Sequence, residues 1–580
     1  MKVRSVARLA LAGIVVVVIG QTMASAQSSA PVLTKPVNAT KEDLSPGRTY
    51  GAPYLVVNPD NPKVIFGGFI EQRSRACGVI RSTDAGQTWK IVAPNINLPS
   101  YPFCLANNSN IFTAPLAFGR DNSIYLATHG WESPERNKTS VVVAKSTDLG
   151  ETWTATVAAD ARPTQGDTQV NNRPVIGLVV DSKSAGSDIV YVGFRQGFPN
   201  LTSPNARPQE PTVITSTDGG KTFGPAVSAR GTLFDEKSVT DQAISARTTI
   251  LGTTTTLAAE GSLGATPSQS KNFGATGNGE GLAVDNQGNV YIAWMTASAN
   301  ITPSAPSGLV VSKSTDRAKT WTTTLVQPFQ YNNRQNPRLA WSPEGGSNGT
   351  LHMVWEGSQN PALNSYADTT YSKSTDANAT WSPPKRLADS DPAQLQGNYL
   401  PNVVIAPNGR VDVVWWDTRD DVGIRANDVY YTYSTDNGET FAKNIRVTDQ
   451  SIDRRFGVWG QNFDQNSPPS LASENEYAIF AWDDTRLSRG EDGQINPVDP
   501  VAAGEGIGGG VQDIFVAVAQ FEPIGGGGVS KTAKYLFAAA IGLLLVGVIL
   551  MVVVFFSRRS AGGAPTSARP KTSTGVKVKK

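Results

Sequence analysis

An eight-residue motif, Ser-Thr-Asp-x-x-x-Thr followed by Trp or Phe, recurs along the chain and constrains its fold more than any other feature; we call it the box. The six boxes span residues 82–89, 146–153, 216–223, 314–321, 374–381 and 434–441. Each follows a β-prone run, and four of them have Gly at the fifth position. Ser and Asp side chains that bond nearby amides, with Gly at a positive φ, are typical of a hairpin turn. The fourth box has Ala318 at the Gly position, so the sequence predicts a distorted turn there.

Each box belongs to a longer unit, which starts at a Pro or Gly and contains an apolar run, a turn, a second run with an aromatic residue, and the strand before the box. The second runs are residues 64–69, 124–128, 189–194, 290–294, 351–355, 411–416 and 477–482. The last of these seven units has no box, but residues 513–516 match its third strand. Four strand-length pieces per unit predict an all-β fold, a β-propeller of seven four-stranded blades.

The seventh unit ends after three strands, which would leave two unpaired sheet edges in an open ring. We therefore expect residues 32–40 to supply its outer strand and to close the propeller, which spans residues 27–522. An insertion at residues 225–278, rich in Thr, Ala, Ser and Gly, is expected to form an extended loop, either as plain decoration or as a cover for a ligand.

Both ends of the chain resemble targeting segments. Residues 1–26 combine three basic residues, an apolar run and a final Ala-Ser-Ala, which is typical of a cleaved signal peptide; an uncleaved anchor is the alternative. After a Gly-rich linker at 523–534, residues 535–556 carry no charge and are long enough to cross a bilayer as a helix. The tail, 557–580, has seven basic and no acidic residues, so we expect it in the cytoplasm. The sequence thus predicts a single-pass protein of the cell membrane with an external propeller.

Charge and cysteine content narrow the function further. Of the 51 basic residues, ten lie in the signal peptide and the tail, so 41 remain against 49 acidic residues, a net charge of about −8 that argues against a nucleic-acid partner. The only cysteines, Cys77 and Cys104, are expected to form one disulfide in an exported chain. With only His129 and His352 present, a His-rich metal site is excluded.

The geometry of a four-stranded blade places the unit starts and the loops after the second strands on one face of the ring, which we call the start face, and the boxes on the other face. Ligands of propellers bind at the mouth of the central channel, where we expect the unit starts to converge. Polar side chains there suit a hydroxylated or anionic ligand such as a sugar, although each could instead be a hydrogen-bonded loop residue. The candidate ligand-binding residues are Arg173, Glu280, Arg334, Tyr399, Asp417, Arg419, Asp483 and Arg486, with Tyr50, Arg73, Asn336, Glu356 and Asn398 beside them.

Trp, Asp and Arg recur together at the ends of two second strands, in Trp416-Asp417-Thr418-Arg419 and in Trp482-Asp483-Asp484-Thr485-Arg486. Each Asp and Arg either pair with each other to fix the loop or present a carboxylate and a guanidinium to a ligand. Calcium is a further candidate, held by Asp417 together with Asp420, Asp421 and Asp428, although the spacing is not that of an EF-hand. No other cofactor or metal is expected.

The boxes resemble the Asp-box (BNR) repeats of the sialidase (neuraminidase) superfamily, and the resemblance covers nearly the whole propeller domain. It implies a β-propeller whose boxes lie away from the ligand site. The best-known sialidases have six blades, so six blades are the alternative to the seven units counted here.

The resemblance does not extend to the catalytic motifs. Sialidases grip the substrate carboxylate with three arginines, use a Tyr activated by Glu as nucleophile and an Asp as acid/base, and carry the first arginine in an Arg-Ile-Pro motif. Here Arg48-Thr49-Tyr50-Gly51 stands near that place, and Arg173-Pro174-Val175 has another order. Although Arg173, Glu280, Arg334 and Tyr399 are of the right chemical types, no catalytic residue is carried over.

Complete scaffold repeats without catalytic motifs favour a membrane-anchored propeller that binds a glycan or another surface ligand without turnover. One alternative is an active glycoside hydrolase of exo-sialidase type with diverged residues, indicated by three arginines and a Tyr–Glu pair at one channel mouth. Another is a scaffold for partner proteins, indicated by an extended exposed apolar patch. The sequence leaves the oligomeric state open.

Overall fold

The computed structural model describes residues 30–45, 48–93, 95–96, 98–104, 114–133, 139–160, 176–184, 186–196, 210–231, 273–275, 281–298, 306–330, 336–357, 368–391, 397–421, 426–453, 456–457, 467–488 and 511–521. The chain divides into two units, residues 1–522 and 523–580, and all described residues belong to the first. The expected signal peptide, linker, membrane span and tail lie outside the described residues. Within the ranges given above, no helix is long and apolar enough to cross a membrane.

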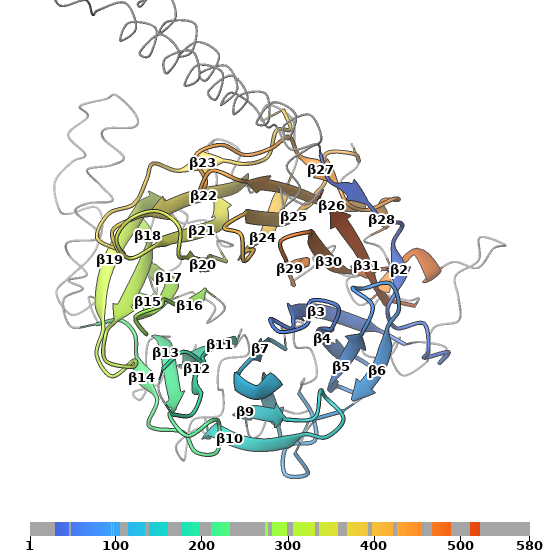
Figure 1. Cartoon of the computed structure of the whole chain (residues 1–580), viewed down its shortest axis with the longest axis horizontal. Coiled ribbons are helices and arrows are strands. Elements are labelled where there is room, and N and C mark those ends of the chain that lie inside the picture. The colour runs from blue at the N-terminus through green and yellow to red at the C-terminus, as the bar shows by residue number, and fades with distance from the viewer. Residues whose placement is uncertain are drawn as a thin grey trace, which may run out of the picture. The chain divides into compact units, whose positions relative to one another are not determined.

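Seven antiparallel sheets surround a common centre, each running outward from an innermost strand (Figure 1). Blades 1 to 3 consist of β3 (Tyr50–Val57), β4 (Ile65–Glu71), β5 (Ala76–Ser82) and β6 (Lys90–Ala93); β7 (Leu116–Phe118), β8 (Ile124–Trp131), β9 (Thr139–Ser146) and β10 (Thr154–Asp160); and β11 (Gly177–Asp181), β12 (Ile189–Gln196), β13 (Glu210–Ser216) and β14 (Val227–Ser228). Blades 4 and 5 consist of β16 (Leu282–Val284), β17 (Val290–Ser298), β18 (Pro306–Ser314) and β19 (Thr322–Gln330); and β20 (Arg338–Ser342), β21 (Thr350–Gly357), β22 (Asp368–Ser374) and β23 (Lys385–Arg386).

Blade 6 consists of β24 (Asn398–Ile405), β25 (Val411–Asp417), β26 (Ala426–Ser434) and β27 (Ile445–Arg446), with β28 (Ile452–Asp453) also paired to β26. Blade 7 consists of β29 (Ser470–Ser473), β30 (Tyr477–Asp484) and β31 (Asp513–Gln520), completed by strands from the chain's beginning. From the 225–278 insertion the structure describes β14 and β15 (Phe273–Ala275), and β15 pairs with β17. The prediction of seven four-stranded blades, rather than six, is confirmed.

Residues 32–40 close the ring, as expected. Strands β1 (Val32–Leu33) and β2 (Val37–Asn38) both pair with β31, the last strand of blade 7. The Thr40 hydroxyl donates to the Asp513 carboxylate over 2.8 Å and accepts from the Ile514 amide over 3.2 Å. The Arg48 guanidinium forms a salt bridge with Asp513 at 2.9 Å. Blade 7 therefore combines the two ends of the propeller domain in one sheet.

Apolar side chains pack between the faces of neighbouring blades, because strand residues point alternately to the two faces of a sheet. The described core consists of seven clusters, and each contains residues of two adjacent blades. The cluster between blades 7 and 1, for example, brings Tyr50 and Ile80 together with Ile479 and Val516. Ring closure thus buries the same kind of interface as every internal pair of blades.

The box turns place two successive residues at positive φ within the loop that joins the third and fourth strands, an eight-residue loop in blades 1 and 4. In the last box, for example, Asn437 has φ 57° and Gly438 has φ 79°. The expected distortion of the fourth box is wrong: Ala318 adopts φ 63°, and its amide donates to the Ser314 hydroxyl over 2.9 Å as Gly438 does to Ser434 over 2.8 Å. Burial of Ala318 against the neighbouring blade accompanies the strained conformation.

Each box also contacts the preceding blade. A Cβ on Gly150 would lie 2.8 Å from Phe66 of blade 1, so the fifth position there requires Gly. Basic residues complete the contact: Arg81 donates to the Leu149 carbonyl over 2.7 Å, and Lys373 donates to the Asn437 carbonyl over 2.8 Å. The boxes therefore join blades to one another, in addition to turning the chain.

The structure confirms that the boxes and the unit starts lie on opposite faces. On one face, the amide of Ala85 in the first box donates to the carbonyl of Lys63, in the turn between β3 and β4, over 2.9 Å. On the other face, Gln72 after β4 donates to the carbonyl of Thr49 just before β3 over 3.0 Å. Cys77 of β5 forms a disulfide with Cys104, with 5.9 Å between their Cα atoms.

Candidate ligand-binding face

The sequence predicts eight candidate ligand-binding residues on the start face. Arg173, Glu280 and Arg334 lie outside the described residues. The other five belong to blades 6 and 7, where their contacts are defined: Tyr399, Asp417, Arg419, Asp483 and Arg486.

Asp417, the last residue of β25, is fully buried and surrounded by donors. Its carboxylate accepts hydrogen bonds from Asn398 Nδ2 at 2.8 Å, from Trp415 Nε1 at 2.9 Å, and from the amide and the guanidinium of Arg419 at 2.8 and 2.6 Å. A buried carboxylate needs hydrogen-bond donors, because they replace the water that burial removes. Asp417 therefore fixes the loop after β25.

Blade 7 repeats this arrangement around Asp484 and not around Asp483. Asp484 accepts from Trp482 Nε1, from the Arg486 amide and from the Arg486 guanidinium, each over 2.8 Å. The strand register explains the shift, because Trp482 pairs with Phe515 in blade 7 as Trp415 pairs with Tyr430 in blade 6. Asp483 in blade 7 therefore occupies the strand position that Trp416 occupies in blade 6.

Arg419 and Arg486 clamp neighbouring blades together. Each guanidinium stacks on the aromatic ring of the third strand, Arg419 at 4.0 Å from Tyr430 and Arg486 at 4.2 Å from Phe515. Each also reaches a carboxylate of the preceding blade, and the two contacts are Arg419 to Asp389 at 2.6 Å and Arg486 to Asp449 at 2.9 Å. Burial acts to lower the pKa of both arginines, but hydrogen bonds and charge raise it above the ordinary value, first from Asp417 and Asp484 and then from Asp389 and Asp449. We call each set of contacts an arginine clamp.

Asp483 and Glu356 hold the starts of the following blades. The Ala52 amide donates to Asp483 Oδ1 over 2.9 Å, and the Leu400 amide donates to Glu356 Oε1 over 2.9 Å. Ala52 has φ 53° and Leu400 has φ 50°, each lies before a proline, and each sits at an irregularity of its strand pair. The carboxylates thus stabilise a strained bend that starts the innermost strand.

Tyr399 and the proposed calcium ligands are also engaged within blade 6. Asn427 Nδ2 donates to the Tyr399 hydroxyl over 3.1 Å. Asp420 accepts from Tyr430 over 2.7 Å, and Asp428 accepts from Thr448 over 2.6 Å. Among the residues that the structure describes, no group of three or more acidic, His or Cys side chains is arranged to hold a metal ion.

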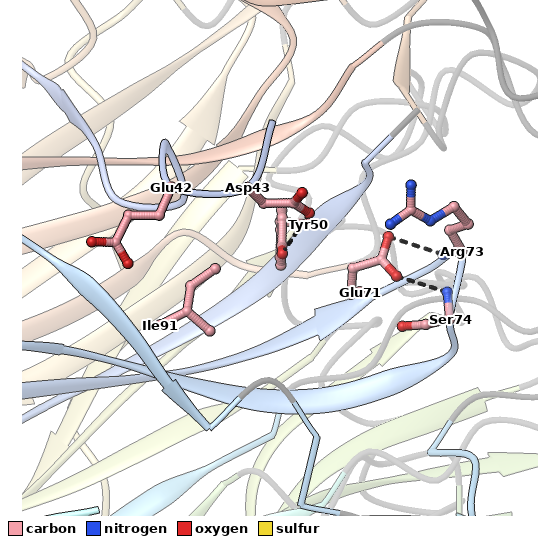
Figure 2. Close-up of a pocket in the computed structure, with 7 residues that line it drawn as sticks. All are labelled: Glu42, Asp43, Tyr50, Glu71, Arg73, Ser74 and Ile91. Carbon is pink, nitrogen blue, oxygen red and sulfur yellow. Dashed lines mark hydrogen bonds between the residues drawn. The ribbon is translucent and has the colours of Figure 1, made fainter. Parts of the chain in front are cut away.

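A cavity of about 390 Å³ opens on the start face between blade 1 and the segment that follows β2; we call it the seam cavity (Figure 2). Its lining residues are Glu42, Asp43, Tyr50, Glu71, Arg73, Ser74 and Ile91. Glu42 and Asp43 follow β2, whereas the other residues belong to blade 1 or immediately follow β4. The volume lies near the lower end of the roughly 300–1,000 Å³ typical of small-molecule sites.

Two carboxylates of the seam cavity are committed to the protein's own donors. Asp43 accepts from the Ser45 amide over 2.8 Å and from the Tyr50 hydroxyl over 2.9 Å. Although burial acts to raise the pKa of Asp43, hydrogen bonds from Ser45 and Tyr50 hold it below its usual value. Glu71 accepts from the amides of Arg73 and Ser74 over 3.2 and 2.7 Å, as the dashed lines of Figure 2 show.

Sequence reasoning named Tyr50 and Arg73 beside the channel mouth but missed Glu42 and Asp43. Their placement depends on the closing strand, because β2 carries them to the edge of blade 1. The expected pairing of residues 32–40 with blade 7 could have predicted this position, because Glu42 and Asp43 directly follow that segment.

No protein-family model matches the chain, and no curated protein matches it. Similar solved structures include a protein of unknown function from Dyadobacter fermentans, 12% identical, with a TM-score of 0.42 and a match over 72% of this chain and 97% of that one. An alpha-L-arabinanase from Penicillium chrysogenum is 14% identical, with a TM-score of 0.39 and coverage of 67% and 94%. A Hadza microbial sialidase is 12% identical, with a TM-score of 0.37 and coverage of 73% and 72%.

The solved structures similar to this chain thus include a sialidase and an arabinanase. At these identities and TM-scores the likeness carries no argument about the activity of this chain. The class of protein rests on the chain's own features, and these define a seven-bladed β-propeller whose box turns join successive blades.

Proposed function

We propose that this chain is a membrane-anchored, externally displayed propeller that binds a glycan on its start face without turning it over. The observation that carries the proposal is the engagement of Glu356, Asp417 and Asp483 with protein donors. Most glycoside hydrolases use two carboxylates that flank the scissile bond, whereas sialidases use an Asp as acid/base and a Tyr activated by Glu, so either type needs a carboxylate that is free to exchange a proton. Carboxylates that hold buried main-chain and side-chain donors serve the scaffold instead.

The glycan as ligand is supported by the chemistry of the start face and by the resemblance of the boxes. Carboxylates, a guanidinium and hydroxyl groups line the seam cavity, and such groups match sugar hydroxyls, which both donate and accept hydrogen bonds. Membrane display is supported by the sequence alone, through the apolar segment at 535–556 and the basic tail after it.

The first test is an activity assay on residues 27–522 with a fluorogenic aryl sialoside, beside Arg334→Ala and Tyr399→Phe variants. We expect no release of the fluorophore above the rate without protein, and binding of the same sample to a subset of spots on a glycan array. Release that the two variants abolish would replace the proposal with a diverged hydrolase. A folded sample that neither hydrolyses nor binds any glycan would refute both.

Display at the membrane is tested separately with the full chain in intact cells. We expect an added protease to remove the propeller and to leave the tail after residue 557 intact. Digestion of the tail with protection of the propeller would contradict the proposed orientation.

A further inference from the structure

Arg73 in blade 1 is the structural counterpart of Arg419 in blade 6 and Arg486 in blade 7. Each arginine lies two residues after the end of its second strand, β4, β25 or β30. The amide of each donates to the carboxylate of the last residue of that strand, over 2.8 to 3.2 Å. The backbone therefore sets all three arginines in the same place relative to their blades.

The partners that complete the arginine clamp are absent from blade 1. In blades 6 and 7, Tyr430 and Phe515 of the third strand supply the rings on which the arginines stack. The corresponding third-strand residue of blade 1 is Gly78, which pairs with Phe69 and has no ring. Lys41 stands where the preceding blades supply Asp389 and Asp449. The backbone establishes the equivalence of Lys41, Asp389 and Asp449. In each of blades 7, 5 and 6, the residue two positions before it donates its amide hydrogen to a carbonyl of the third strand of that blade.

Without these partners, the Arg73 guanidinium makes no hydrogen bond or ion pair with any residue that the structure describes, although its positive charge contributes to lowering the pKa of Asp43. It borders the seam cavity, as do the Ser74 hydroxyl and the Glu42 carboxylate, which likewise have no bonded partner in the described part of the chain (Figure 2). Asp43 and Glu71 direct their oxygens to their own donors. Arg73 thus offers unused donors to the cavity, and Glu42 offers an unused acceptor.

We propose that the seam cavity binds an acidic sugar, whose carboxylate takes the place at Arg73 that Asp389 takes at Arg419 and Asp449 takes at Arg486. A planar carboxylate accepts two parallel hydrogen bonds from a guanidinium, a geometry that a hydroxyl group does not match. The sugar hydroxyls bond to Glu42 and Ser74, and its apolar ring face packs on Ile91. The sugar class of ligand rests on the proposed function, whereas the carboxylate rests on the missing clamp partners.

Occupancy of the seam cavity also bears on ring closure. Glu42 belongs to the segment that closes the ring, and Arg73, Ser74 and Ile91 belong to blade 1. A ligand that touches both sides stabilises the closed ring relative to the open one by mass action. The negative charges of Glu42, Asp43 and Glu71 oppose an anion, so we expect an affinity on the order of 1 mM for a single sugar unit.

The test measures binding of sodium D-glucuronate and of D-glucose, which lacks the carboxylate, to the full-length protein in detergent micelles by ligand-observed NMR. Wild type is expected to bind glucuronate at least about tenfold more tightly than glucose, the factor that corresponds to about 1.4 kcal/mol. Arg73→Gln removes this preference and Arg73→Lys retains part of it, because lysine keeps the charge but not the fork. Lys63→Gln, which removes a charge on the box face, is the matched control and leaves binding unchanged.

Three results would overturn the inference: no binding of glucuronate by wild type, equal binding of the two sugars, or glucuronate binding that Arg73→Gln leaves unchanged. Acetate that binds as tightly as glucuronate would overturn the sugar and leave only an anion site. The proposed function fails separately: if glucuronate binds at Arg73 but no glycan array spot is recognised, the glycan proposal falls and the carboxylate site stands. If Arg73→Gln keeps every array signal and the affinity for glucuronate, the carboxylate site at Arg73 falls and the glycan proposal stands.

Discussion

The backbone amide of Ala52 donates a hydrogen bond of 2.9 Å to the carboxylate of Asp483, which follows 431 residues later in the chain. This bond joins the first strand of blade 1 to the second strand of blade 7. Leu400 and Glu356 form the same bond between blades 6 and 5. The closing interface therefore uses a device that the ring also uses internally, and its strength can be measured.

We predict that Asp483→Ala destabilises the folded propeller by about 1–3 kcal/mol, because it leaves the buried Ala52 amide without its acceptor. Urea unfolding of the variant and of wild type measures the difference. Asp60→Ala, at an exposed carboxylate in the turn between β3 and β4, is the control and should change the free energy of unfolding by less than about 0.5 kcal/mol. Equal effects of the two substitutions would show that the Ala52 bond contributes nothing to stability.

The contact between boxes and preceding blades predicts a difference between two glycines at positive φ. A Cβ on Gly438 would collide with the Tyr371 hydroxyl, whereas a Cβ on Gly186 would meet nothing within 4 Å. Both Gly→Ala variants carry a backbone cost of about 1–2 kcal/mol. Gly438→Ala should cost about 1–3 kcal/mol more, the usual cost of overpacking. Thermal or urea unfolding of both variants compares the costs, and equal values would mean that the box has no packing role.

Buried His352 predicts an acid-sensitive contribution to stability. Its Nδ1 lies 2.8 Å from the Tyr371 hydroxyl, and burial, with a smaller effect of Lys373, lowers the pKa of the imidazole from 6.5 to about 3. Between these pKa values the unfolded chain binds a proton that the folded chain excludes, so stability is full above about pH 6.5 and falls as the pH falls toward 3.

The predicted slope for this one proton is up to about 1.4 kcal/mol per pH unit. Urea unfolding of wild type and His352→Gln from pH 7 to pH 4.5 isolates it, because all other groups are shared. The free energy of unfolding of wild type should fall more steeply with acid than that of the variant. Parallel pH profiles would show that His352 does not titrate on unfolding.

The disulfide between Cys77 and Cys104 closes a loop with a sequence separation of 27. In the chain-entropy account of disulfides, a loop of this length contributes about 3–4 kcal/mol, mainly by restricting the unfolded chain. We expect a Cys77→Ser, Cys104→Ser double variant to lose this amount in urea unfolding. A reducing agent should lower the stability of wild type to that of the variant and leave the variant unchanged. An effect of the reductant on the variant would contradict this account.

Much of the architecture follows from local patterns that repeat. The box has the turn chemistry and the unit has strand-length runs, so blade number and strand order are readable without any distant contact. The closing strand also follows, because a three-stranded last unit leaves a sheet edge that residues 32–40 are free to cover. The disulfide pairing required only that two cysteines be present.

Residue roles on the start face are less readable, because they depend on register. Asp483 and Asp484 are adjacent acids, and only the pairing of Trp482 with Phe515 decides which of them meets Arg486. The φ of Ala318 is set by the blade on which its turn packs, which overrides the preference of alanine. The sequence does not distinguish Arg73 from other loop arginines. Only its structural equivalence to Arg419 and Arg486 shows that blade 1 lacks the clamp partners.

The strand that closes the ring is translated first and finds its place last. Thr40 bonds to Asp513, and the two residues are separated by 473 positions. At the roughly 5–20 residues per second of protein synthesis, the segment that carries Thr40 waits about 25–95 seconds for its partner to exist. During that interval the two blade faces at the opening of the ring stay uncovered. A nascent chain that stalls before Asp513 therefore exposes two apolar surfaces to other chains. Completion of synthesis through Asp513 is therefore required before the closing strand can pair and cover these surfaces.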